Sequence, residues 1–136
     1  MSAEDLSEDV QLFLRDRIRS FEQLEALRLI HSERTEAWTP EAIAARLRIP
    51  PAVADEALQR LYAQGLLSSR VQAGITVYRY AADAQLDAGV ANIFKAYDEN
   101  RVAVMTVMTK NAVERVRGSV INTFADAFLI GRKRDG

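Results

Sequence analysis

Between Val10 and Ile30 the apolar residues recur at steps of three and four, which is the spacing of one face of an α-helix. Ser20 followed by Gln23 matches a capping box, so this stretch predicts two helices that separate near Ser20. The first of them belongs to an acidic helical arm over residues 1–20. The second is expected to be the first helix of the core.

The clearest helix start in the chain lies in the segment WTPEAIAARLRI. Thr39 stands at the N-cap, and Pro40 stands at the first helical position, where its missing N–H is not needed. Trp38 before the cap and Ile43 inside the helix are spaced as a hydrophobic staple. A short, alanine-rich helix is therefore predicted over residues 40–47.

A third helix is predicted from Pro51 onward, after a tight turn at residues 48–50. Gly65 supplies the left-handed residue that ends it. The buried face of this helix is expected to consist of Ala54, Leu58 and Leu61.

After Gly65 the pattern changes from helical to extended. Residues 66–71 and 75–80 are rich in β-branched and aromatic side chains, and Gln72-Ala73-Gly74 lies between them. This arrangement predicts a β-hairpin.

From Asp83 onward the pattern is helical again, with Asp83 and Asp98 as the expected N-caps of two successive helices. A strand over residues 102–108 is the alternative, but the length of the surrounding periodic pattern favours helix. Gly118 is expected to break or bend the last helix, and residues 131–136 are expected to form a loose basic tail. The candidate dimer or partner interface consists of a seam with coiled-coil-like spacing and of two aromatic residues after it: Val102, Met105, Thr109, Ala112, Val116, Phe124 and Phe128.

The order of these elements resembles the winged helix-turn-helix domain of bacterial transcriptional regulators, with the MarR-type families the nearest in style. The resemblance covers about residues 21–80 and rests on WTPEAIAARLRI, ALQRLYAQGLL and VYRYAA in this order. It implies a mainly α fold with a small β-hairpin, and a winged-helix domain over residues 21–82. Residues 83–130 are then a helical region for dimerisation or interaction.

The amino-acid composition limits the kinds of functional site that this chain can form. The 136 residues include no cysteine and one histidine, His31, so disulfides are excluded and a zinc or iron site is disfavoured. The glycines form no phosphate-binding loop, and no nucleophile is paired with a base. We therefore expect neither an enzyme nor a cofactor. With no leader and no membrane-spanning run visible, a cytoplasmic protein without membrane contact is expected.

Charge is distributed unevenly, with a net charge of −4 over residues 1–36, +2 over 37–82 and +1 over 83–136. In DNA-binding winged helices the third helix lies in the major groove, so the resemblance implies that Gln59 faces bases. Asp55 and Glu56 on the same helix would be repelled by phosphates. The candidate nucleic-acid-binding residues are Arg46, Arg48, Gln59, Arg60, Arg70 and Arg79.

Two functions follow from this reading. The first is a homodimeric regulator that binds duplex DNA. The alternative is an adaptor that does not bind DNA specifically and engages another protein through its third helix or its acidic N-terminal arm, as Asp55, Glu56 and the net charge of residues 1–36 suggest.

Overall fold

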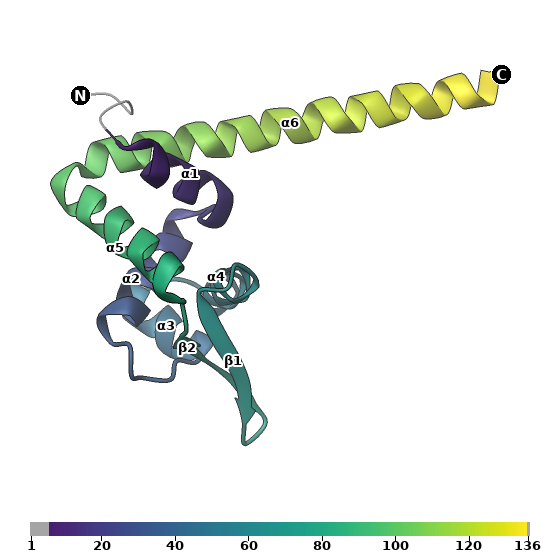
Figure 1. The fold of residues 1–136 in the computed structure, drawn as a ribbon. Helices are drawn as coiled ribbons and strands as arrows, with labels where there is room; N and C mark the ends of the chain where they lie inside the picture. Colours follow the sequence, from purple (N-terminus) through teal and green to yellow (C-terminus); the bar gives the residue numbers. More distant parts are fainter. Residues whose placement is uncertain (1–5, 136) are drawn as a thin grey trace.

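The structure is a computed structural model that describes the backbone of residues 6–135 and the side chains of residues 6–125. Figure 1 shows a helical body, a β-hairpin that projects from one end of it, and a long C-terminal helix that runs well past it. The elements in chain order are α1 (Glu8–Arg17), α2 (Phe21–Ser32), α3 (Pro40–Leu47), α4 (Pro51–Ala63), β1 (Leu67–Gln72), β2 (Ile75–Tyr80), α5 (Ala84–Glu99) and α6 (Arg101–Asp135). This is the predicted mainly α fold with a small hairpin.

The N-terminal helix is part of the body, and this corrects the expectation of an arm. Leu6, Val10, Leu14 and Ile18 are all buried in the main hydrophobic core. Helix α1 packs against α5 and α6 through this face. An apolar stripe on a short helix needs such a partner, because burial rather than helix propensity supplies most of its stability.

The predicted helix starts are confirmed at three places. The side chains of Ser20, Thr39 and Asp83 each accept a hydrogen bond from the backbone N–H three residues later. At the first of these caps the carbonyl oxygen of the Gln23 side chain accepts from the N–H of Arg19, at 2.9 Å, one residue before the expected donor. These local caps fix where α2, α3 and α5 begin.

A single residue before α3, Trp38, pairs with β2 of the hairpin. The backbone N–H groups of Trp38 and Tyr78 each donate to the other residue's carbonyl oxygen at 2.8 Å. Both side chains are buried, as is Ile43 in α3. The segment before α3 is thereby attached to β2, so the hairpin is fixed to the body at its base.

The hairpin turn consists of Ala73 and Gly74, and both have positive φ, at 52° and 79°. Positive φ at both central residues defines a type I′ turn, which matches the twist of the strands. Alanine in this conformation is strained because its Cβ approaches the backbone.

Ala73→Asn is expected to stabilise the protein by about 0.5–1 kcal/mol, because asparagine followed by glycine is the preferred type I′ pair. Gly74→Ala is the matched opposite and is expected to cost about 1 kcal/mol. An alanine Cβ at Gly74 would meet no atom within 4 Å, so only backbone strain enters. Urea unfolding of both variants measures these changes, and a shift in the same direction for both would contradict the turn assignment.

The junction of the last two helices differs from the prediction. Helix α5 continues through Asp98 to Glu99, and α6 begins at Arg101. The N-cap of α6 is Asn100, whose side-chain oxygen accepts from the N–H of Ala103 at 3.2 Å. Asp98 instead pairs with Arg28 of α2 at 2.7 Å.

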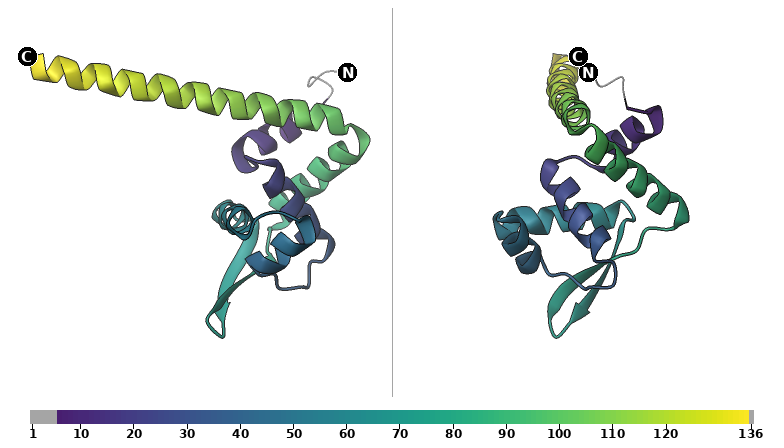
Figure 2. Two further views of the ribbon diagram at one scale, coloured as in Figure 1. Left: turned by 180° about the vertical axis from the view of Figure 1, so that it is seen from behind. Right: turned by 90° about the vertical axis from the view of Figure 1, so that its left-hand side faces the viewer.

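Helix α6 has 35 residues and is about 52 Å long at 1.5 Å per residue. It passes through Gly118 without a break, and it continues to Asp135 where a loose tail was expected. A single glycine costs only about 1 kcal/mol in a helix, and the residues on both sides of Gly118 can carry the helix across it. The strand alternative for residues 102–108 is excluded. The left view of Figure 2 shows from behind how far α6 extends beyond the body, and the right view looks nearly along the axis of α6.

Candidate nucleic-acid interface

Helices α3 and α4 are joined by a tight turn that holds them at a fixed angle. Arg48 ends α3 in the left-handed conformation, with φ 57° and ψ 48°, and Pro50 and Pro51 lead directly into α4. Ile43 and Ala44 of α3 are buried together with the predicted α4 face of Ala54, Leu58 and Leu61. This packing leaves the N-terminal residues of α4 at the surface, which is the arrangement of a helix-turn-helix.

On the exposed face of α4, two acidic residues form hydrogen bonds with the two candidate DNA-binding residues of the same helix. The Gln59 amide nitrogen donates to the Asp55 carboxylate at 2.7 Å, and Arg60 Nε donates to Glu56 at 3.2 Å. Both contacts join residues four positions apart on one helix. Gln59 and Arg60 are therefore already partnered in the free protein.

Two of the candidate arginines are held by other parts of the fold. Arg79 Nη1 donates to the carbonyl oxygen of Thr35 at 2.7 Å and so fastens the loop before α3 to β2. Arg46 lies over the Trp38 ring, 5.5 Å from its centroid, with a longer ion pair to Glu33 at 3.7 Å. Arg46 remains about half exposed and can still reach outward.

Arg48 and Arg70 are two further exposed residues among the candidate arginines. Arg48 stands at the turn between α3 and α4, and Arg70 lies on β1, opposite Val77 in the hairpin. Within the described part of the chain neither guanidinium makes a hydrogen bond or an ion pair. Both are therefore available to a phosphate group.

Sequence reasoning missed the apolar surface beside these cations. Tyr62 on α4 is 52% exposed, and Val71 and Ile75 near the tip of the hairpin are exposed as well. No clear signal for this surface exists in the sequence, because every residue of β1 after Leu67 is exposed and burial does not alternate along the strand. An exposed apolar hairpin tip can contact sugar and base edges without any cation.

A polar cluster joins the end of α2, the end of β2 and the start of α5. The Tyr80 hydroxyl donates to the Asp87 carboxylate, and Arg34 lies 3.5 Å from the same carboxylate. The Tyr80 hydrogen bond, and then the Arg34 charge, hold the pKa of Asp87 below its usual value. Arg34 Nη2 also donates to His31 Nε2 at 2.6 Å. The cluster thus connects the hairpin to the helix that leads into α6.

His31 gives this cluster a pH dependence that can be tested. Burial and then the Arg34 charge lower the pKa of His31 below 6.5, and Asp87, 3.9 Å away, opposes them. A lowered pKa means that the unfolded chain binds the proton more readily than the folded one. The free energy of unfolding is therefore expected to fall as the pH drops below about 6.5.

His31→Gln removes the proton that the unfolded chain takes up at this position. The free energy of unfolding should consequently decrease less between pH 7.5 and pH 5 in the variant than in the wild type. Urea titrations of both proteins at the two pH values give the comparison. An equal decrease in both proteins would show that the pKa of His31 is the same in the folded and unfolded states.

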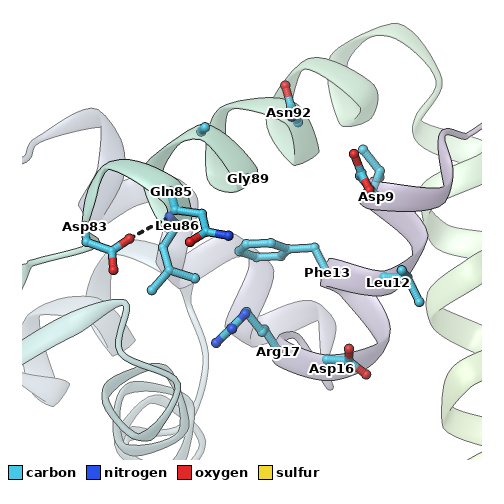
Figure 3. Close-up of a pocket in the computed structure, with 12 residues that line it drawn as sticks. Asp9, Leu12, Phe13, Asp16, Arg17, Asp83, Gln85, Leu86, Gly89 and Asn92 are labelled. Atoms are coloured by element: carbon cyan, nitrogen blue, oxygen red, sulfur yellow. Dashed lines mark hydrogen bonds between the residues drawn. The ribbon is translucent and has the colours of Figure 1, made fainter.

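A groove of about 570 Å³ lies between α1 and α5 (Figure 3). The Phe13 ring points across it toward α5 and lies against Gly89, where an added Cβ would come within 2.5 Å of the ring. Arg17 lies 5.8 Å from the centroid of the same ring and donates to the carbonyl oxygen of Gln64 at 3.1 Å. Glycine at position 89 therefore permits the close approach of α1 and α5.

Helix α6 has two different faces, and the predicted seam occupies the outer one. Ala103, Val104, Val107 and Met108 are buried against the body. The seam residues Val102, Met105, Thr109, Ala112 and Val116 are exposed or half-buried on the other side. Val102 and Val116 are 69% and 65% exposed, and Phe124 farther along is 75% exposed. The Phe128 side chain lies outside the described residues.

Other kinds of site find no support in the described part of the chain. No group of three or more histidine and acidic side chains there is arranged to hold a metal ion. None of its helices is both long enough and apolar enough to cross a lipid bilayer.

Neither a protein-family model nor a curated protein sequence matches this chain. Among solved structures, the homodimeric winged helix-turn-helix DNA-binding domain Mb0332 from Mycobacterium bovis, a possible ArsR-family regulator, is similar at 23% identity. That match covers 66% of this chain and 81% of the other, with a TM-score of 0.52. A point mutant of MepR from S. aureus, bound to an oligodeoxyribonucleotide, is similar at 14% identity, 92% and 91% coverage and a TM-score of 0.52. A second MepR mutant, from a multidrug-resistant clinical isolate of S. aureus, gives the same TM-score and coverage at 13% identity. This chain therefore has a winged helix-turn-helix fold, in which α3 and α4 form the helix-turn-helix and β1 and β2 form the wing.

Proposed function

We propose that this protein is a non-catalytic, dimeric regulator of transcription that binds duplex DNA and acts in the bacterial cytoplasm. The observation that carries the proposal is the agreement of the fold with S. aureus MepR over 92% of the chain, since that neighbour was solved on an oligodeoxyribonucleotide. The agreement extends beyond the winged helix to the terminal helices.

The DNA surface is proposed to bind mainly the phosphate backbone. Helix α4 would enter the major groove through its exposed N-terminal residues. Gln59 is the residue of this helix whose side chain is suited to read a base. Because Gln59 donates to Asp55 in the free protein, it would have to leave Asp55 to contact the base. Arg60 is held by Glu56 in the same way. Arg48 and Arg70 supply the phosphate contacts.

The dimer is proposed to form through the outer face of α6. Its apolar seam has the three- and four-residue spacing by which two helices pack along each other. Two copies related by a two-fold axis would present two α4 helices to DNA. The spacing of the two half-sites would then follow from the length of α6 that the copies share.

The salt dependence of binding tests the phosphate contacts. Four contacts per dimer, from Arg48 and Arg70 of each copy, give a slope of about −3.6 in a plot of log K against log salt. Arg48→Gln or Arg70→Gln removes two contacts per dimer and should make the slope shallower by about 1.8. Lys95→Gln, on the exposed side of α5, is the matched control and should leave the slope unchanged.

The first experiment is a titration of mixed genomic duplex fragments at two salt concentrations, with the molecular mass measured on the same sample. Salt-sensitive binding by a dimer supports the regulator. No binding even at low salt would overturn it.

The adaptor alternative has less support. The helix of the expected acidic arm is packed into the body through Leu14 and Ile18, so it is not a free segment. Asp55 and Glu56 already bond within α4. No feature of the described residues points to a particular protein partner.

A further inference from the structure

A pocket of about 320 Å³ lies where α2 begins, beside α4 and the middle of α6. Arginines from three separate parts of the chain line it: Arg19 just before α2, Arg60 on α4 and Arg115 on α6. No sequence motif connects these residues. The fold alone brings the three guanidinium groups to one pocket.

Arg115 is only partly satisfied in this pocket. Its Nη2 donates to the carbonyl oxygen of Arg19 at 2.7 Å. Its Nη1 is buried and has no hydrogen-bond partner in the described part of the chain. A buried donor on a charged group is costly when it is left unpaired. Arg115 Nη1 therefore keeps a hydrogen-bond donor that no acceptor within the described residues uses.

The charges around Arg115 also affect its pKa. Burial, and then the charges of Arg19 and Arg60, lower the pKa of Arg115. Glu56 and Glu22 also line the pocket, but Glu56 is engaged with Arg60 at 3.2 Å. Neither carboxylate contributes to the shift at Arg115. Burial and the two neighbouring arginine charges therefore disfavour the charged form of Arg115.

We propose that this pocket binds the phosphate group of a small molecule between Arg19, Arg60 and Arg115. A phosphate offers several acceptor oxygens and negative charge, and guanidinium groups bind it through paired hydrogen bonds. The N-terminus of α2 at Ser20 also lines the pocket, and its helix dipole favours an anion. The volume is that of a small ligand site.

Such a ligand touches two parts of the regulator at once. It bonds Arg60 on the helix proposed to enter DNA and Arg115 on the helix proposed to pair the two copies. A ligand that binds more tightly to one relative position of these helices shifts the population toward it. This consequence rests on the proposed function, whereas the binding site itself does not.

The test uses the full-length protein without DNA and inorganic phosphate as the probe. At 10 mM, phosphate is expected to raise the melting temperature by about 4 °C over sodium chloride of equal ionic strength, if its dissociation constant is near 1 mM. Arg115→Gln should abolish the shift. Arg117→Gln, an exposed arginine two residues later on α6, should retain it.

Arg60→Gln provides a second variant in case Arg115→Gln does not fold, because the Arg60 side chain is about 43% exposed. It should at least halve the phosphate shift. An absent shift in the wild type, or an equal shift in the wild type and both pocket variants, would overturn the proposal. Isothermal titration calorimetry with phosphate checks the stoichiometry of one site per chain.

A separate arm distinguishes a small ligand from the DNA backbone. If Arg115→Gln and Arg60→Gln weaken DNA binding in phosphate-free buffer, the pocket holds a DNA phosphate and the small-molecule assignment is wrong. If DNA affinity is unchanged there while the phosphate shift is lost, the assignment is supported. Failure of the protein to bind DNA at all would overturn the proposed function and leave the phosphate test intact.

Discussion

Met105→Lys combined with Val116→Lys is expected to convert the proposed dimer to a monomer. The two side chains lie on the outer face of α6, away from the buried Val104 and Val107, so lysine at these positions does not disturb the body. In the proposed dimer the same positions are buried between two copies, which places four lysines in the interface. Each unpaired buried charge costs several kcal/mol. The dissociation constant of the dimer should consequently rise more than 100-fold.

Light scattering on the purified protein at about 10 µM measures this change in mass. Asn122→Lys combined with Ala125→Lys is the matched control, because both residues are exposed on the opposite side of the same helix. The control adds the same charge and should remain dimeric. An unchanged mass for the seam variant would remove this face of α6 from the interface. DNA affinity of the monomer should also fall, because only one half-site contact remains.

Sequence reasoning succeeded where structure depends on near neighbours. Thr39 and Pro40 begin α3, and Gly65 ends α4 with φ 79°, because caps and left-handed residues act within one turn of helix. The buried face of α4 followed from its spacing alone. The order of the helices and the hairpin was predictable for the same reason.

The errors arose where a distant contact decides the outcome. Asp98 was expected to cap α6, but Arg28 of α2 binds it and α5 continues past it. Arg79 remains a candidate phosphate contact, but its hydrogen bond to the carbonyl oxygen of Thr35, 44 residues away, could not be predicted. No pattern along the chain predicts such pairs. The same limit applied to the pocket around Arg115, whose partner Arg19 lies 96 residues earlier.

Trp38→Ala is expected to have the largest effect on stability and to uncouple the wing from the body. The Trp38 side chain is 6% exposed and belongs to the main core, and its backbone holds Tyr78 of β2. Removal of a buried tryptophan costs about 3–5 kcal/mol because a cavity remains. That loss is a large part of the roughly 5–15 kcal/mol by which domains of this kind are stable. Urea unfolding measures the loss, and amide exchange at Tyr78 should become faster.

Trp38→Phe separates the packing of the ring from its polar atom. The indole Nε1 is buried without a hydrogen-bond partner in the described part of the chain, and phenylalanine removes it while keeping an aromatic ring. Relief of the unpaired donor offsets the smaller volume, so stability should remain within about 1 kcal/mol of the wild type. A loss as large as that of Trp38→Ala would contradict this expectation. With the wing held in place, Trp38→Phe should bind DNA like the wild type, whereas Trp38→Ala should bind more weakly because Arg70 is no longer positioned.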